Sequence, residues 1–162
     1  MKNRKRFVAV LGATASTVLA ALLATPAAQA QQTPKPEQLI KWRQSAYQVI
    51  AWNTGRVKAN VDGTYNKDDV IKAANAIAAL ANSGLGALYA PGTETGKGWK
   101  ETAAKPELFT DKKAGEVAAS FNKEANELAR VAAAGDVSQV KAQLAKLQGT
   151  CKACHDDYRK KD

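Results

Sequence analysis

Side chains that commonly bind metals and cofactors are scarce in this sequence: its 162 residues include one histidine, two cysteines and one methionine, which is Met1. A structural zinc site needs four ligands, whereas the histidine and the cysteines offer only three of the usual types. Runs of β-branched residues are also rare, and segments rich in alanine and lysine alternate with clusters of glycine and proline. This composition favours an all-α protein.

Basic residues are not gathered into a stripe with aromatic side chains, as they are in many nucleic-acid-binding proteins. They are spread along the chain, and no nucleic-acid-binding motif is present. We therefore expect no nucleic-acid partner.

The one histidine and the two cysteines lie together in the sequence Cys151-Lys152-Ala153-Cys154-His155. A C-x-x-C-H run is typical of covalent haem c attachment. Residues three and four apart share a helix face, so both cysteines can form thioethers to the vinyl groups of one porphyrin edge while His155 stands beneath the iron. We expect one haem c, bound through Cys151 and Cys154, with His155 as the metal ligand. A disulfide between the cysteines is the alternative, although it would not require the adjacent histidine.

The first 30 residues have the pattern of a secretory signal peptide. An apolar stretch of small residues over 7–24 is followed by the cleavage-site sequence Ala28-Gln29-Ala30. The apolar stretch is short for a membrane span, which argues against a retained anchor. We expect cleavage after Ala30 and export to a bacterial periplasm, where haem c is attached, with no membrane attachment of the processed chain. The positively charged start comprises Lys2, Arg4, Lys5 and Arg6.

Removal of this leader leaves residues 31–162, the size of a single haem-binding domain with one core. They carry 20 basic and 15 acidic residues, a net charge of +5. Part of this charge lies in the C-terminal sequence Arg159-Lys160-Lys161. A solvated helix end and a surface that attracts acidic partners are both consistent with it.

Four segments have apolar residues spaced three and four apart, as in amphipathic helices. The first runs from Pro36 to about 60–63, and the second from just after Asn66 to about 82–84. The third spans about 111–134 and the fourth about 137–160. Short connections make neighbouring helices antiparallel, so we predict an antiparallel up-down-up-down four-helix bundle with the haem near one end. The inward stripe of the fourth segment comprises Val137, Val140, Leu144, Leu147, Cys151, Cys154 and Tyr158.

Residues 84–108 contain enough glycine and proline to exclude a continuous helix. A connection of this length within one domain usually has a function or wraps around a bound group, and the edge of a haem could be that group. Apolar residues such as Leu88, Tyr89 and Trp99 can dock this segment onto the bundle.

The second axial position on the iron has no obvious protein ligand. Met1 leaves with the leader and the only histidine is already used, so neither Met/His nor bis-His ligation is possible. No lysine falls on an identified inner stripe, and burial of a neutral lysine costs free energy. We expect five-coordinate, high-spin iron with a vacant distal site.

Three segments together resemble the cytochrome c′ family: the opening KPEQLIKWRQSAY, the loop sequence APGTE and the last helix with CKACHDDYRKK. The resemblance covers essentially all of residues 31–162 and implies the same four-helix fold. It also implies a distal side chain over the iron at Tyr47 and a partner for a haem propionate at Arg43, with Gln44 beside it.

The same resemblance places Arg159 close to the proximal side of the haem. It places Thr93 and Glu94 near the haem edge, although the following stretch, residues 95–104, is longer than the usual family pattern. Taken without the family, Arg43 and Arg159 could simply be solvated.

Tyr47 has three interpretations. It could be an ordinary core residue, an iron ligand through its phenolate, or a steric gate, meaning a bulky side chain that an incoming ligand must displace. A phenol near its ordinary pKa of about 10 is mostly neutral at pH 7 and coordinates weakly. We therefore favour the steric gate.

A shielded haem with one protein ligand and an apolar distal pocket should bind small uncharged diatomic gases, chiefly nitric oxide and carbon monoxide. We expect a gas-binding protein, with an electron-transfer cytochrome that serves an unidentified redox partner as the alternative. An enzyme such as a peroxidase is not expected, because no second histidine or paired acid is placed to handle a peroxide proton. The resemblance also implies a homodimer through the first two helices, where Trp42 and Trp52 would suit a contact if they do not pack internally.

Overall fold

The computed structural model describes residues 33–161, so the predicted signal peptide over 1–30 lies outside the described residues. Four α-helices account for most of this part: α1 (Pro36–Asp62), α2 (Lys67–Ala81), α3 (Lys112–Ala134) and α4 (Val137–Tyr158). Two short 3₁₀ helices, η1 (Leu85–Leu88) and η2 (Pro106–Phe109), lie between α2 and α3. Residues 33–161 contain isolated β-bridges but no strand, and none of their helices is long and apolar enough to cross a bilayer.

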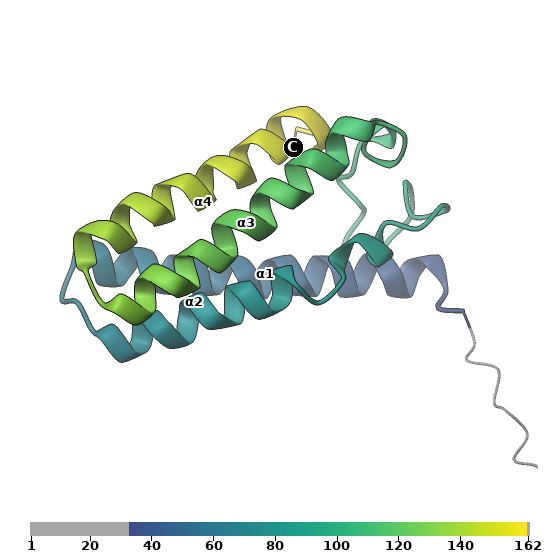
Figure 1. The fold of residues 1–162 in the computed structure, drawn as a ribbon. Helices are drawn as coiled ribbons and strands as arrows, with labels where there is room; N and C mark the ends of the chain where they lie inside the picture. Colours follow the sequence, from purple (N-terminus) through teal and green to yellow (C-terminus); the bar gives the residue numbers. More distant parts are fainter. Residues whose placement is uncertain (1–32, 162) are drawn as a thin grey trace, which may run out of the picture. The chain divides into compact units, whose positions relative to one another are not determined.

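Consecutive helices run antiparallel and pack side by side, and α1 and α4 close the bundle (Figure 1). The predicted all-α, up-down-up-down four-helix bundle is therefore confirmed. The α1–α2 and α3–α4 connections lie together at one end, called here the connection end. The start of α1, the long 82–111 connection and the end of α4 lie at the other, called here the loop end, where the α3/α4 pair diverges from the α1/α2 pair.

Helix boundaries follow the capping residues in the sequence. Asn66, Asp111 and Asp136 are N-caps whose side chains each accept a hydrogen bond from a backbone N–H in the first turn of α2, α3 and α4. Gly135 ends α3 in the left-handed conformation, with φ at 84°, which a residue without a side chain adopts at little cost. These local signals explain why the predicted boundaries lie within three residues of the observed ones.

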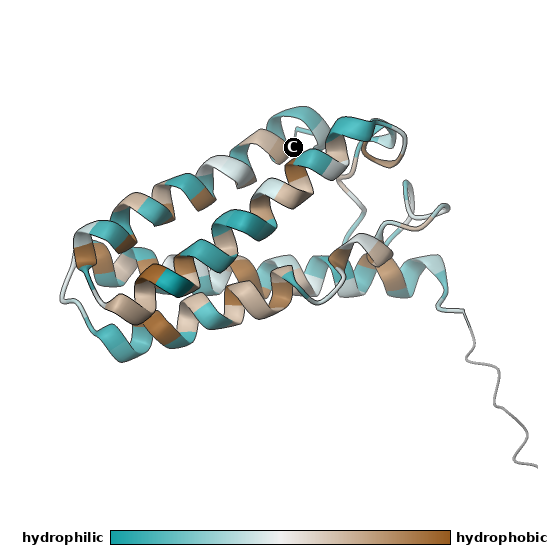
Figure 2. Cartoon of the chain, viewed as in Figure 1, coloured by the Kyte–Doolittle hydropathy of each residue, from teal (hydrophilic) through white to brown (hydrophobic). Residues whose placement is uncertain are grey.

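The aliphatic core is concentrated towards the connection end, where Figure 2 shows apolar residues on the facing sides of the helices. Val137, predicted to face inward, is instead 40 % exposed, because it is the first residue of α4 and lies beyond the layer that contains Val140. The largest fully buried aliphatic residues of this core are Val57, Val70, Ile77, Leu128, Val140 and Leu147.

Several inward-facing residues at the loop end are only partly buried. Phe121 of α3 and both cysteines of α4 are half-buried, and Tyr47 of α1 is 39 % exposed. They continue the same helical stripes that are fully buried at the connection end. Packing of the protein atoms therefore thins towards the loop end, which is where the cysteines lie.

Candidate functional site

Cys151, Cys154 and His155 lie in the last two turns of α4. The helix is continuous through Tyr158, so the predicted placement of residues three and four apart on one face is realised. Both thiols are half-buried, and burial raises the pKa of each above the usual value. His155 is more exposed at the edge of this face, and desolvation lowers its pKa.

Tyr47 of α1 stands opposite the two cysteines, close enough for both thiols to influence its ionisation. Burial is the largest influence and raises the pKa of Tyr47 above its ordinary value. Its phenol is therefore neutral at neutral pH. The structure thus brings Tyr47, Cys151 and Cys154 together across the loop end.

Tyr89 is a site residue for which sequence reasoning gave no role beyond docking. It follows η1 in the long connection and lies close enough to Tyr47 to influence the pKa of that phenol. Burial is the largest influence on Tyr89 and raises the pKa of its phenol above the ordinary value. An aromatic residue among glycines and prolines was the only signal of this role in the sequence.

Arg43 is buried one turn before Tyr47 and binds the connection rather than solvent. Its Nη1 donates to Leu88 O at 3.0 Å and to Thr93 Oγ1 at 3.1 Å, and its Nη2 donates to Thr93 O at 3.0 Å and to Thr102 Oγ1 at 2.9 Å. Desolvation lowers the pKa of this guanidinium, although Tyr89, Tyr47 and Glu94 oppose the effect. The alternative that Arg43 is simply solvated is wrong, because this residue is 5 % exposed.

Two aromatic rings enclose the Arg43 guanidinium. Its carbon atom lies 4.6 Å from the ring centroid of Tyr89 and 5.9 Å from that of Phe109, and the two ring centroids are 5.9 Å apart. These cation–π contacts and the four hydrogen bonds fix both ends of the connection to α1.

Gln44 holds the middle of the connection, over residues 96–102, against α1. Its Oε1 accepts from the backbone N–H of Trp99 at 2.7 Å, and its Nε2 donates to Lys100 O at 2.8 Å. The indole N–H of Trp99 donates to Ser45 Oγ at 2.7 Å, and Lys41 Nζ lies 3.8 Å from the Trp99 ring centroid. The longer-than-usual stretch in the sequence is thus a small turn packed on α1.

The remaining predicted residues lie within the connection and at the end of α4. Thr93 is fully buried beneath Arg43, and the half-buried Glu94 is close enough to influence its charge. Arg159 is extended and forms an antiparallel bridge with Ala104, which explains why α4 ends two residues earlier than predicted. The backbone N–H of Lys160 donates to Ala103 O at 2.8 Å, so the connection binds the end of α4 as well as α1.

Comparison with known proteins decides what this arrangement belongs to. The family model described as Cytochrome C' matches residues 38–159. The curated cytochrome c' of Rhodocyclus tenuis is 69 % identical over 130 residues, which are 79 % of this chain and 98 % of the relative.

This chain belongs to the cytochrome c′ family.

Solved structures agree with this assignment. One, described as a cytochrome c' with an unusual ligand-controlled dimer dissociation, is 45 % identical, with a TM-score of 0.77 over 80 % of this chain and 99 % of its own. Another is the nitric oxide complex of a leucine-to-isoleucine variant of cytochrome c prime from Alcaligenes xylosoxidans, 31 % identical, with a TM-score of 0.71 over 80 % of this chain and 100 % of its own. A further variant of that Alcaligenes protein is described with bound carbon monoxide.

Cytochromes c′ are haem c proteins, and this cytochrome c′ has two cysteines for covalent attachment. The residues at the loop end fit such a group. Thiol and imidazole side chains occupy one helix face at the required spacing, and the inward apolar faces around them are only half-buried by protein atoms. An apolar macrocycle attached to Cys151 and Cys154 would complete this part of the core.

Proposed function

We propose that this cytochrome c′ is a periplasmic haem protein, not an enzyme, that binds diatomic gases, chiefly nitric oxide and carbon monoxide. When bound, haem c supplies an iron that is five-coordinate and high-spin, with one face open to a gas. The observation that carries the proposal is the position of Tyr47 opposite Cys151 and Cys154. The nitric oxide and carbon monoxide complexes of the Alcaligenes relative support it.

The two faces of the site have different tasks. On α4, Cys151 and Cys154 would hold the macrocycle and the His155 imidazole would bind its iron. On α1, the neutral phenol of Tyr47 covers the opposite face as a steric gate. Residues 33–161 contain no second histidine and no methionine, so neither common side chain competes with the gas for that face.

The other predicted site residues border the haem in this proposal. Arg43 and Gln44 hold the connection beside it, Thr93 and Glu94 lie in that connection, and Arg159 lies one turn after His155. The hydrogen bonds of Arg43 and Gln44 support a positioning role for both.

Export and dimer formation also belong to the proposal. The signal-peptide pattern of residues 1–30 supports a periplasmic location for residues 31–162. The outer face of α1 exposes Trp42, Val49 and Trp52, which supports a homodimer through this helix. The dimer dissociation described for the solved relative gives further support. An unidentified redox partner stays an expectation from the sequence.

Carbon monoxide titration of the ferrous protein tests the steric gate. If Tyr47 must be displaced at a strain of about 2–3 kcal/mol, Tyr47→Ala should bind carbon monoxide about 30- to 150-fold more tightly. Tyr47→Phe keeps the bulk, so its affinity should change far less and its ferric spectrum should stay that of the wild type.

Three results would contradict the proposal. A large spectral shift in Tyr47→Phe would identify the tyrosine as an iron ligand. Equal affinities of the wild type and Tyr47→Ala would show that Tyr47 is ordinary core. A low-spin ferric spectrum of the wild type would favour the electron-transfer alternative.

A further inference from the structure

All three tryptophans of this chain are exposed, and they gather on the outer side of α1. Trp42 is 47 % exposed, Trp99 58 % and Trp52 63 %. Trp42, Ser45, the exposed Val49 and Trp52 follow one another along α1 at intervals of three, four and three residues, which places them on one helix face. This face is called here the α1 ridge. Exposed apolar side chains that cluster in this way mark an interaction surface.

Trp99 comes from the turn over residues 96–102, but its side chain joins the α1 ridge. The indole N–H donates to Ser45 Oγ at 2.7 Å, and Lys41 Nζ lies 3.8 Å from the ring centroid. Because Ser45 lies three residues after Trp42 and four before Val49, its bond to the indole places the Trp99 ring between the apolar residues of the ridge. The turn therefore widens the exposed apolar surface of α1.

The spacing of the α1 ridge suits a second copy of this chain. Intervals of three, four and three residues read the same in both directions, so an antiparallel copy presents the same pattern, as a two-fold interface requires. Trp42 then lies opposite Trp52 of the second copy, and Ser45 lies opposite its Val49. The Trp99 ring, held on Ser45, faces Val49 of the second copy as well.

The α1 ridge alone is small for an interface. From Trp42 to Trp52 it is about 15 Å long and about 10 Å wide, whereas a stable interface commonly covers about 800 Å² on each partner. Surface beside the ridge must therefore contribute, and the turn that carries Trp99 packs directly against it.

We propose that Trp99 and its turn are part of the surface through which two copies of this cytochrome c′ associate. This inference rests on the homodimer in the proposed function. It goes beyond that homodimer because it places a segment from outside the helices in the interface.

Sedimentation equilibrium of the holoprotein tests the proposal. Trp99→Ala removes the ring but keeps the hydrogen bonds between Gln44 and the backbone of the turn. We expect the dimer Kd to rise about 30-fold or more, because a tryptophan buried at an interface is commonly a hot spot and each dimer contains two copies of it. Val137→Ala, which shortens an exposed apolar side chain at the connection end, is the control and should keep the wild-type Kd.

Hydroxyl-radical footprinting shows whether the Trp99 ring itself becomes covered. Its oxidation should fall as the concentration of the wild type rises through the dimer Kd, in parallel with that of Trp42. Val49→Glu places a charge at the centre of the α1 ridge and should keep the protein monomeric. Oxidation of Trp99 in this variant should not depend on concentration.

The possible failures are distinguishable. A wild type that stays monomeric at every concentration overturns the homodimer and this inference together, and leaves the binding of gases as proposed. A dimer whose Kd is the same in Trp99→Ala, or in which Trp99 is oxidised equally at all concentrations, overturns this inference alone.

Discussion

Arg43 is a buried cation whose four hydrogen bonds all go to uncharged oxygens. Burial of a charge without hydrogen bonds is very costly, so the planar guanidinium is important here because it satisfies acceptors in several directions at once. Three of its acceptors belong to Thr93 and Thr102, which are themselves buried. Each would be left without this partner if Arg43 were replaced.

Arg43→Lys keeps the positive charge but cannot reach all of these oxygens together. We expect the free energy of unfolding to fall by about 2–4 kcal/mol, since each unsatisfied buried acceptor costs about 1–3 kcal/mol. Urea unfolding followed by circular dichroism measures this loss.

Arg130→Lys is the control for this prediction. Arg130 is an exposed arginine of α3 that pairs with Glu127 three residues before it, so its replacement should leave the urea midpoint unchanged. Equal midpoints for Arg43→Lys and the wild type would mean that the hydrogen bonds to the connection contribute nothing to stability.

The structural element that carries each site residue explains whether the sequence predicts its position. Cys151, Cys154 and His155 form a motif within one helical turn, so local spacing determines their arrangement. Tyr89 approaches Tyr47 from the long connection between α2 and α3, and spacing along the chain says nothing about such proximity. The burial of Arg43 could not be predicted for the same reason, because its hydrogen-bond partners lie 45 to 59 residues away along the chain.

Among the structural elements, the turn over residues 96–102 depends on a close approach to α1. It is closed by a hydrogen bond from Thr102 N to Gly96 O at 2.9 Å. A Cβ atom on Gly98 would lie 2.7 Å from the backbone nitrogen of Lys41 and 2.7 Å from Gln44 Oε1. Only a residue without a side chain allows the turn to lie this close to the helix.

Gly98→Ala should therefore lift the turn from α1, because the backbone of the helix cannot move away. We expect trypsin to cleave after Lys97 or Lys100 markedly faster than in the wild type, while helix content is unchanged. Mass spectrometry of the fragments identifies the cleavage sites. Gly115→Ala is the control, because a Cβ atom at this position in α3 meets nothing within 4 Å. Trypsin should cleave this variant at the wild-type rate. An unchanged rate for Gly98→Ala would mean that the turn already moves freely.

Helices were the most predictable elements, and the connection between α2 and α3 was the least. Capping residues such as Asn66 and Asp136 mark helix ends locally, whereas the end of α4 depends on Ala104, which lies 55 residues before its bridge partner Arg159. The sequence does show that residues 84–108 form no continuous helix. It does not show that this segment binds α1 and α4 together.

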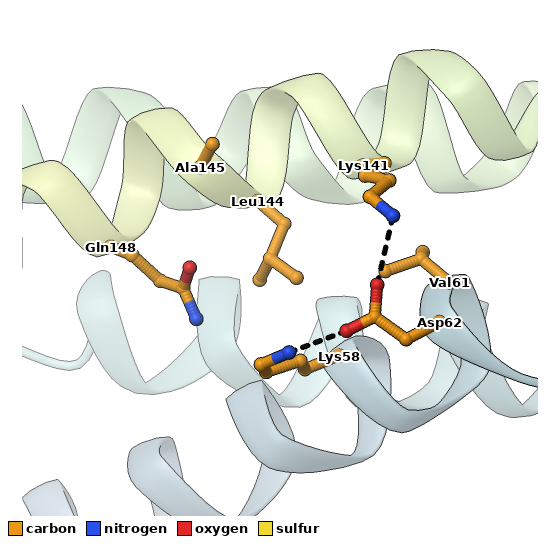
Figure 3. Close-up of a pocket in the computed structure, with 7 residues that line it drawn as sticks. All are labelled: Lys58, Val61, Asp62, Lys141, Leu144, Ala145 and Gln148. Atoms are coloured by element: carbon orange, nitrogen blue, oxygen red, sulfur yellow. Dashed lines mark hydrogen bonds and ion pairs between the residues drawn. The ribbon is translucent and has the colours of Figure 1, made fainter.

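At the scale of the whole molecule, the two ends of the bundle are stabilised by different interactions. At the connection end, Asp62 of α1 accepts hydrogen bonds from Lys58 in its own helix and from Lys141 of α4 at 2.9 Å (Figure 3). These lysines lower the pKa of Asp62 to about 2. They line a shallow pocket with Leu144 and neighbouring residues of both helices.

This lowered pKa predicts how stability responds to acid. A carboxylate with a depressed pKa in the folded state stabilises the fold above its unfolded pKa of about 3.9, and the effect is lost as the pH falls to about 2. The wild type should melt at a higher temperature than Asp62→Asn at pH 5, and this difference should disappear between about pH 4 and pH 2. Thermal melts followed by circular dichroism give both values.

Glu116→Gln, which removes an exposed carboxylate of α3 elsewhere on the bundle, controls for the loss of one negative charge. Its difference from the wild type should be small throughout the same pH range. A constant difference between the wild type and Asp62→Asn from pH 5 to pH 2 would contradict the assignment of the lowered pKa to Asp62.

Half-burial of Cys151 and Cys154 also bears on whether haem attachment precedes or follows folding. Thiolates react and thiols do not, and burial in the folded chain raises the pKa of both cysteines, which favours the unreactive thiol. Pairing of Lys160 with Ala103 then restricts the end of the helix that carries them. We therefore expect haem attachment to be easier on an unfolded chain than on a finished bundle, and a thiol reagent should modify the urea-unfolded apoprotein faster than the folded one. In this view the last helix must meet its haem before the rest of the chain closes around it.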